Sequence, residues 1–182
     1  FDPGEQRFAE SLMSLGNGAM GLRGNFEEGY SGDSLQGTYI GGVWFPDRTR
    51  VGWWKNGYPA YFGKVINAMD LIGIRAAVNG ETLDAGGMKV QDFYRELDMR
   101  TGILRREMTL ITRQGKVRLT AERFVSMADK ALLAVRLTLT PDHSAKVELT
   151  AFLDSDVRNE DSNYEERFWE QLDAGACAGE RC

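Results

Sequence analysis

Residues 117–139 read VRLTAERFVSMADKALLAVRLTL, and apolar and polar residues alternate in both halves of this stretch. In the second half, Leu133, Val135, Leu137 and Leu139 alternate with Ala, Arg and Thr side chains. Successive side chains of a β-strand point to opposite faces of its sheet, so a period of two predicts strands with one buried face. We therefore expect two antiparallel strands here, with these four apolar side chains facing the interior of a β-sandwich.

The same alternation extends over most of the chain after residue 70. Further strands are predicted at residues 72–78, 92–99, 103–112 and 147–153. The dipeptide Asn79-Gly80 predicts a tight hairpin turn, because both residue types tolerate a positive φ. Several strands at about ten-residue spacing are typical of an antiparallel sandwich, so the predicted fold class is all-β. No repeat or linker divides the sequence, and we expect a single domain over residues 1–182.

The end of the chain changes its period. Tyr164, Phe168 and Leu172 recur every four residues, and the sequence SNYE at residues 162–165 resembles a capping box. This pattern predicts a short C-terminal helix near residues 163–174.

Composition and charge exclude several classes of protein. The chain carries 22 basic and 27 acidic residues, a net charge of −5, without a basic stripe that would bind nucleic acid or anionic lipid. No stretch approaches the ~20 apolar residues of a membrane span, and the start FDPGEQRFAE lacks the pattern of a signal peptide. We therefore expect a cytoplasmic protein. Cys177 and Cys182 have no further Cys or His nearby to complete a zinc site, and we interpret them as free thiols.

The sequence contains a glycine pattern that also occurs in dinucleotide-binding proteins. Gly16, Gly18 and Gly21 satisfy G-x-G-x-x-G, but that site needs a buried strand before the glycines and a helix after them. The preceding FAESLMSL is a poor strand, so we favour a glycine-rich β-turn.

Two adjacent carboxylates, Glu27 and Glu28, suggest the acid and base of a glycosidase. Neighbouring residues of an extended chain point to opposite faces, whereas the catalytic pair must flank one bond at roughly 5 to 9 Å from each other. We therefore expect one carboxylate to bond the backbone of a loop and the other to lie in solvent.

Neither a calcium site nor a histidine site is predicted. Asp154 and Asp156 begin a calcium-like loop, but Arg158 replaces an oxygen ligand and Asn159 replaces the glycine of the turn, so we expect a solvated acidic loop. His143 is the single histidine and lies in a predicted turn, where a surface imidazole is expected; a catalytic triad or a histidine metal site cannot be assembled around it.

The segment VGWWKNGYPAYFGKV at residues 51–65 concentrates large aromatic side chains between Gly and Pro residues, which favours an ordered loop over a strand or a helix. Its candidate functional residues are Trp53, Trp54, Lys55, Tyr58 and Tyr61. Three roles remain open from the residues alone: packing in the core of this domain, stacking on sugars, and docking onto another domain.

Three long motifs resemble one known family. ESLMSLGNGAMGLRGNFEEGYSGDSLQGTYIGGVW, YRELDMRTGILRRE and ERFVSMADKALLAVRLTLT are similar to the N-terminal domain of the family 65 glycoside hydrolases, which are largely disaccharide phosphorylases. FPDRTRVGWWKNGYPAYFGKVINA and DSDVRNEDSNYEERFWE are most similar to the members that act on maltose, as opposed to trehalose or kojibiose. The resemblance covers about residues 8–170.

The resemblance implies a large antiparallel β-sandwich of the galactose-mutarotase-like kind. The sandwich would be incomplete here, because some late strands of its second sheet would follow residue 182. In the family, a helical linker and an (α/α)6 barrel come next, and the barrel holds the catalytic Glu and the phosphate site. No catalytic residue is therefore expected in this chain. The implied reaction is inverting phosphorolysis of maltose to β-glucose 1-phosphate and glucose, with inorganic phosphate as co-substrate and without a metal or other cofactor.

The resemblance also implies partners. These are the barrel of the same polypeptide, a second subunit of a homodimer and a disaccharide substrate, and the aromatic loop is expected to dock onto the barrel or the partner subunit. The alternatives are a stand-alone carbohydrate-binding module and a kojibiose or trehalose phosphorylase of the same family. An aldose epimerase with this topology would need a His and a carboxylate in one cleft, which the turn histidine does not favour.

Overall fold

The computed structural model describes residues 1–49, 59–160 and 167–173 of the chain. A 3₁₀ turn, Pro3–Glu5, and helix α1, Gln6–Leu12, precede the strands. The strands are β1 (Leu15–Gly16), β2 (Met20–Leu22), β3 (Thr38–Ile40), β4 (Trp44–Arg48), β5 (Tyr61–Val65), β6 (Ile74–Val78), β7 (Glu81–Thr82), β8 (Lys89–Asp98), β9 (Ile103–Thr112), β10 (Gly115–Val125), β11 (Leu133–Pro141) and β12 (Val147–Ala151). The described fold is thus nearly all β, as predicted.

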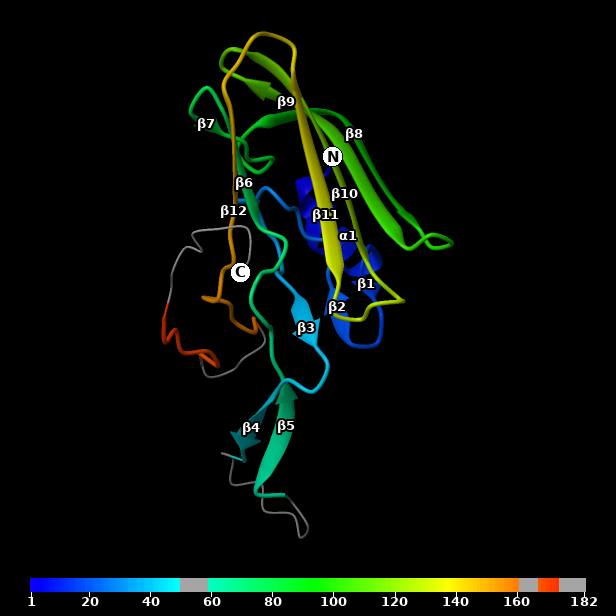
Figure 1. Cartoon of the computed structure of the whole chain (residues 1–182). Helices are drawn as coiled ribbons and strands as arrows, with labels where there is room; N and C mark the ends of the chain where they lie inside the picture. Colours follow the sequence, from blue (N-terminus) through cyan, green and yellow to red (C-terminus); the bar gives the residue numbers. More distant parts are fainter. Residues whose placement is uncertain (50–58, 161–166, 174–182) are drawn as a thin grey trace.

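The strands form four antiparallel sheets (Figure 1). The largest has the order β11-β10-β9-β8, and a second sheet, β12-β6-β7, packs against it. Sheet β1-β2-β3 lies beside α1, and β4 and β5 form a hairpin that projects from the rest of the molecule. Strands β6 to β12 lie in the region where consecutive antiparallel strands were predicted, and that prediction is confirmed.

The core lies between the large sheet and the second sheet. Val117, Leu119 and Ala121 of β10 face Ala76 and Val78 of β6, and all five side chains are buried. Leu137 and Leu139 of β11 pack against the same cluster, while Leu133 and Val135 pack against a smaller one near β1 and β2. The prediction that these four residues of β11 face the interior is confirmed.

The turn between β6 and β7 follows from its two residues. Asn79 and Gly80 have φ values of 51° and 80°, and they connect strands in which Val78 lies opposite Glu81. This two-residue connection is the hairpin that the dipeptide predicts.

The other face of the large sheet is charged and exposed. Arg105 Nε of β9 lies 3.0 Å from Glu122 Oε1 of β10, and Arg136 Nη1 of β11 lies 3.1 Å from Glu122 Oε2. Because these residues alternate with the buried ones along each strand, the sheet has one apolar face and one charged face.

The predicted C-terminal helix is not present in the part of it that the structure describes. Residues 163–166 and 174 lie outside the described residues, and residues 167–173 have no helical structure. The ring of Phe168 packs against Phe45 with centroids 5.0 Å apart, and Trp169 Nε1 donates to the Asn67 carbonyl oxygen at 2.6 Å. Phe168 and Trp169 are thus both held by contacts with distant residues. These contacts outweigh the four-residue spacing that predicted a helix.

The aromatic segment is also more regular than expected. Residues 61–65 were predicted to belong to a loop, but they form β5, which pairs with residues 44–48 of β4. The pairing partner lies outside the segment, at residues 44–48, so the period of residues 51–65 alone did not reveal the strand.

The alternation along β10 can be tested by two neighbouring substitutions. Leu119→Ala removes a fully buried side chain and is expected to lower the free energy of unfolding by about 2–5 kcal/mol. Thr120→Ala, on the opposite face, is expected to cost less than about 1 kcal/mol. Urea unfolding of both variants measures the difference, and equal losses would contradict this orientation of the strand.

Candidate functional site

Two buried arginines on the inward face of the large sheet bind both adjacent glutamates. Arg106 of β9 donates from Nη1 to Glu28 Oε1 at 2.7 Å and from Nη2 to Glu27 Oε2 at 2.8 Å, and its Nη2 also contacts Glu28 Oε2. Arg123 of β10 lies 3.0 Å from Glu27 Oε1. The guanidinium of Arg106 also lies over the ring of Phe26, 3.9 Å from its centroid. We call these four charged residues the buried ion-pair network.

The expectation that one of the two glutamates lies in solvent is wrong. Glu27 is 3% exposed and Glu28 is 4% exposed. The expectation assumed an extended chain, but these residues lie outside the strands, just before Gly29, whose φ is 88°. In this bent segment, neighbouring carboxylates reach the same guanidinium. Both carboxylates are occupied by arginine, so neither can serve as a free acid or base.

The arginines set the ionisation of Glu27. Burial alone raises the pKa of the Glu27 carboxyl, but Arg123 and Arg106 outweigh this effect and hold the pKa below its ordinary value. Burial raises the pKa of Glu28, and Arg106 opposes this rise without cancelling it. Glu27 is therefore the anion that the two cations share, which fixes the segment around it to β9 and β10.

The segment before Glu27 is held in the same way. Arg123 donates from Nη1 to the Asn25 carbonyl oxygen at 2.8 Å and from Nη2 to the Arg23 carbonyl oxygen at 2.6 Å. The amide of Gly24 donates to the carbonyl oxygen of Glu10 in α1 at 2.7 Å. A Cβ at Gly24 would lie 2.8 Å from the Cβ of Met13, so the approach of this segment to α1 requires glycine.

A second buried carboxylate fixes helix α1. Glu10 is fully buried, and its Oε1 accepts hydrogen bonds from Gln6 Nε2 at 3.1 Å and from Ser34 Oγ at 2.6 Å, while its Oε2 accepts from the Leu35 amide at 2.9 Å. Gln6 in turn accepts from Arg95 Nη1 of β8 at 3.3 Å. The helix is therefore attached both to the large sheet and to the chain that leads into β3.

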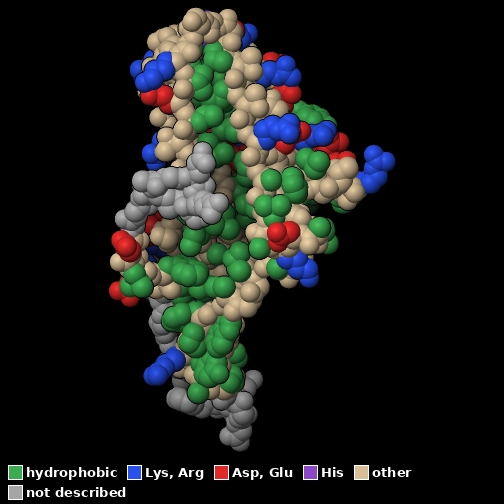
Figure 2. Space-filling view, in the orientation of Figure 1, with side chains coloured by type: hydrophobic (Ala, Val, Ile, Leu, Met, Phe, Trp, Pro, Cys, Tyr) green, Lys and Arg blue, Asp and Glu red, His purple; other side chains and the backbone are tan. Residues whose placement is uncertain are grey.

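The β4–β5 hairpin carries an exposed pair of stacked aromatic side chains. Trp44 and Tyr61, each 52% exposed, stack with their ring planes 12° apart and their centroids 6.3 Å apart. Gly63 lies between them on β5, and an added Cβ there would meet the Trp44 ring at 3.6 Å. Val65 is 63% exposed at the end of the same strand. Figure 2 shows hydrophobic side chains along the visible face of the hairpin.

A hydrogen-bond hub fixes the base of this hairpin. Asn67, which is buried, donates from Nδ2 to the carbonyl oxygens of Gln36 at 3.1 Å and Arg158 at 2.8 Å. The backbone amide of Asn67 donates to Asn159 Oδ1 at 2.9 Å, and its backbone carbonyl oxygen accepts from Trp169 Nε1 at 2.6 Å. The aromatic surface therefore projects from a rigid base, which suits a surface that must meet a partner in one orientation.

Most of the predicted aromatic candidates cannot be placed. Trp53, Trp54, Lys55 and Tyr58 lie outside the described residues, and only Tyr61 is placed. Its exposure does not decide between docking and sugar stacking, so the assignment stays a prediction. Sequence reasoning missed Trp44, although the sequence VWFPDR around it has the length and the aromatic content of a strand that could pair with residues 61–65.

The remaining motifs have structural surroundings. Gly18 has a φ of 84° in the turn between β1 and β2, which confirms the glycine-rich turn. His143 lies in the connection from β11 to β12, as predicted, but it is half-buried, with Nδ1 2.8 Å from Asp142 Oδ1. Asp154 and Asp156 are exposed.

The described part of the chain shows neither a metal-binding cluster nor a membrane-spanning helix. Within residues 1–49, 59–160 and 167–173, no three His, Cys, Asp or Glu side chains are grouped so that they could hold a metal ion. None of the helices described there has the length and apolar composition needed to cross a membrane.

Comparison with known proteins gives a consistent set of matches. Residues 1–180 match the family described as glycosyl hydrolase family 65, N-terminal domain. The maltose phosphorylase of Bacillus subtilis (strain 168) is 55% identical over 179 residues, which are 97% of this chain and 23% of that protein. The kojibiose phosphorylase of Thermoanaerobacter brockii is 32% identical over 82% of this chain and 18% of that protein. The α,α-trehalose phosphorylase of the same organism is also 32% identical, over 82% of this chain and 20% of that protein.

A solved structure agrees with these matches. A provisionally assigned kojibiose phosphorylase from the human microbiome superimposes with a TM-score of 0.80 at 31% identity, over 86% of this chain and 21% of that one. The chain therefore spans less than a quarter of the length of these relatives.

The buried ion-pair network can be tested with a matched pair of arginines on β10. Arg123→Met leaves Glu27 with one cation and removes donors from two carbonyl oxygens, so the free energy of unfolding is expected to fall by about 3–5 kcal/mol. Arg118→Met removes an arginine whose side chain is 60% exposed and is expected to cost less than about 1 kcal/mol. Urea unfolding of the two variants provides the measurement. Losses of similar size would mean that the network does not hold the fold together.

Proposed function

The chain belongs to glycosyl hydrolase family 65, as an N-terminal domain of that family, and from this membership we propose that it is the non-catalytic domain of an inverting maltose phosphorylase. The observation that supports maltose is the higher identity to the Bacillus subtilis enzyme than to the kojibiose and trehalose phosphorylases. Phosphorolysis of kojibiose or trehalose is the alternative within the family.

The proposed reaction transfers a glucosyl group from maltose to inorganic phosphate. A carboxylic acid protonates the glycosidic oxygen as its bond to the anomeric carbon breaks, and phosphate attacks that carbon from the opposite face. The products are β-glucose 1-phosphate and glucose. Phosphate is itself the nucleophile, so the proposal includes no metal or other cofactor. A cytoplasmic location is part of the proposal, because a charged sugar phosphate does not cross a membrane freely.

The catalytic residues are proposed to lie in the part of the polypeptide that follows this domain. Glu27 and Glu28 are buried and bound by arginine, so they cannot reach a substrate. The relatives are more than four times as long as this chain, which leaves room for a catalytic domain in the same polypeptide.

We propose that the β4–β5 hairpin docks this domain onto the catalytic domain or onto the second subunit of a homodimer. Trp44 and Tyr61 present two half-exposed rings on a hairpin whose base is fixed by Asn67. Aromatic side chains of this kind are enriched at interfaces, where they bury a large area at a low entropic cost. Trp53, Trp54, Lys55 and Tyr58 are proposed to belong to the same surface.

The same stacked rings favour a second candidate function. A stand-alone carbohydrate-binding module would use exposed aromatic rings as a platform for sugars. Calorimetric titration of the isolated chain with maltose distinguishes the two functions, because the phosphorylase proposal expects no measurable binding by this domain alone.

The reaction is tested by comparing the full-length polypeptide with the isolated chain. Phosphate-dependent release of glucose is expected from maltose with the full-length protein, and much less from kojibiose and trehalose. The isolated chain is expected to be inactive on all three sugars. Omission of phosphate is the control. Turnover by the isolated chain that a substitution within residues 1–182 abolishes would contradict the assignment as a non-catalytic domain.

Docking through the hairpin is tested by a double substitution. Trp44→Ala with Tyr61→Ala is expected to cost the isolated chain about 1 kcal/mol or less, because both rings are half exposed, and to cost the full-length protein at least about 2 kcal/mol. Tyr94→Ala on the charged face of the large sheet is the matched control, since Tyr94 is 55% exposed. Denaturant unfolding and sedimentation record the stability and the oligomeric state. An equally small loss in the free energy of unfolding of both proteins would contradict docking through the hairpin.

A further inference from the structure

Helix α1 carries apolar side chains on its outer face and polar side chains on its inner face. Phe8 and Leu12 are 61% and 59% exposed, whereas Gln6 and Glu10 are fully buried. Residues four apart share one face of a helix, so each pair forms a stripe, and the two stripes lie on nearly opposite faces. A helix at the surface of a domain normally has the reverse arrangement. We call Phe8 and Leu12 the outer stripe of α1.

The buried contacts of α1 fix this orientation. The Glu10 carboxylate accepts hydrogen bonds from Ser34 Oγ at 2.6 Å and from the Leu35 amide at 2.9 Å. Gln6 Oε1 accepts from Arg95 Nη1 of β8 at 3.3 Å. A rotation that buried the outer stripe would remove these donors from a buried carboxylate, which costs more than the exposure of two apolar side chains. The helix therefore holds the outer stripe away from the domain.

The polar neighbours of the outer stripe on α1 are occupied within the domain. Arg7 Nη1 lies 3.5 Å from Asp33 Oδ1, and Arg7 Nη2 binds Glu160 Oε2. Ser11 Oγ donates to the Arg7 carbonyl oxygen at 3.2 Å. The surface that α1 offers to a partner is therefore mainly apolar, and an apolar partner surface fits it.

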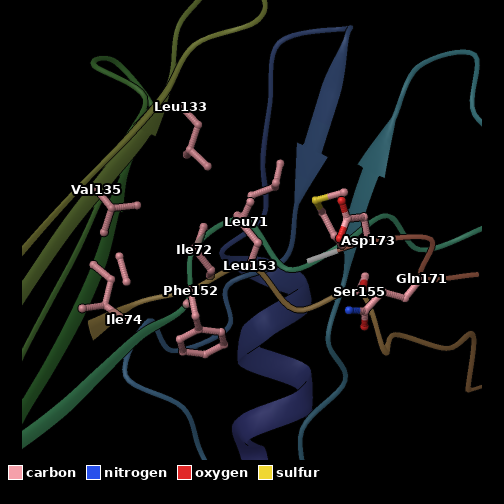
Figure 3. A pocket seen from close by; sticks show the side chains of 13 residues that line it. Leu71, Ile72, Ile74, Leu133, Val135, Phe152, Leu153, Ser155, Gln171 and Asp173 are labelled. Atoms are coloured by element: carbon pink, nitrogen blue, oxygen red, sulfur yellow. The ribbon is translucent and has the colours of Figure 1, made fainter. Parts of the chain in front are cut away.

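The outer stripe is distinct from the apolar groove of the sandwich. That groove has a volume of about 850 Å³ and opens between β11 and the ends of β6 and β12, and its walls include Leu133, Val135 and Phe152 (Figure 3). None of the described residues that line the groove belongs to α1. The outer stripe is therefore a second uncovered apolar surface of the described chain.

We propose that the outer stripe of α1 docks onto an apolar surface of the catalytic domain, in the part of the same polypeptide that lies outside residues 1–182. This inference rests on the proposed function, which assigns the chain to a longer phosphorylase. It adds a contact on a different element from the β4–β5 hairpin, and it commits to one partner.

The size of the outer stripe favours a contact within one polypeptide. Phe8 and Leu12 together leave on the order of 250 Å² of apolar surface uncovered. A stable complex of separate chains buries about 800 Å² on each partner, so the stripe alone is too small to hold a second copy. A covalent connection raises the effective concentration of a domain and lets a smaller contact persist. This chain covers 23% of the Bacillus subtilis relative, which has ample further chain for such a domain.

Photo-crosslinking from position 8 tests the proposal in the full-length protein. Phe8 is replaced by p-benzoylphenylalanine, an aromatic residue that bonds to a neighbouring C–H group on irradiation, and mass spectrometry identifies the joined peptides. Intramolecular cross-links to the catalytic domain are expected, at a yield at least about 10-fold above that from the same replacement at Tyr94, because only a contacting residue is captured. Tyr94 is the matched control, since it is 55% exposed on the charged face of the large sheet.

The other outcomes of this experiment overturn the proposal. Cross-links between two polypeptides would identify a second copy of the chain as the partner. Cross-links confined to residues 1–182, or to a segment before residue 1, would show that the N-terminal domain covers its own helix. A yield no higher than that from Tyr94 would show that the outer stripe stays in solvent.

A charged side chain provides the second test. Leu12→Glu in the same photoreactive protein is expected to lower the yield of these cross-links at least about 5-fold, because a carboxylate is costly to bury in an apolar contact. Tyr94→Glu is the matched control and is expected to leave the yield unchanged. An undiminished yield in a folded Leu12→Glu protein would contradict the proposed contact. If that variant does not fold, the cross-links from position 8 decide alone.

Phosphorolysis is measured separately on the unmodified full-length protein, with maltose, kojibiose and trehalose. Activity on maltose without cross-links to the catalytic domain rejects this inference alone. Cross-links to that domain without activity on any of these sugars reject the proposed reaction alone.

Discussion

The presence of two arginines inside a β-sandwich is the constraint on which the rest of this structure depends. Arg106 and Arg123 occupy inward positions of β9 and β10, between buried apolar residues, so their charges must be neutralised within the core. The segment around Glu27 provides the carboxylates and backbone carbonyl oxygens that do this. A buried ion pair of this kind adds little stability relative to a well-packed apolar core, but the loss of either partner would leave a buried charge without its counter-ion. The position of the N-terminal region relative to the large sheet follows from this requirement.

The sandwich is consequently closed on one side and open on the other. Near the buried ion-pair network, helix α1 and the chain around Glu27 cover β8, β9 and β10 through hydrogen bonds and ion pairs to Arg95, Arg106 and Arg123. Near β11 and β12, no further strand of the described residues pairs with the edges of the two sheets, and the inward apolar residues keep part of their exposure. The aromatic hairpin projects from the rest of the molecule (Figure 1). On the charged face of the large sheet, by contrast, arginine and glutamate side chains of neighbouring strands form ion pairs with each other. These charges therefore contribute little to the binding of a partner.

Local patterns in the sequence predicted the strands well, and contacts between distant segments explain what they missed. The alternation of β11 and the turn at Asn79 depend on a few neighbouring residues, so their positions could be read directly. The alternation along β9 and β10 could also have predicted that Arg106 and Arg123 are buried, because both occupy positions of the apolar face. The pairing of the two glutamates with one arginine could not be foreseen, since it joins residues 78 and 79 positions apart through a bent segment. The helix predicted around Phe168 failed for a similar reason: its pattern is local, whereas its contacts with Phe45 and Asn67 are not.

The hub at Asn67 links the orientation of the hairpin to the order in which the chain is synthesised. Asn67 lies two residues after the end of β5, but two of its hydrogen bonds join it to Arg158 and Trp169, which lie 91 and 102 positions later. While the polypeptide emerges from the ribosome, β4 and β5 can pair as soon as both are made, because only 12 residues separate them. The base of the hairpin gains its remaining anchors only after all the strands of the large sheet have been translated. The direction in which Trp44 and Tyr61 face is therefore set late in the synthesis of residues 1–182.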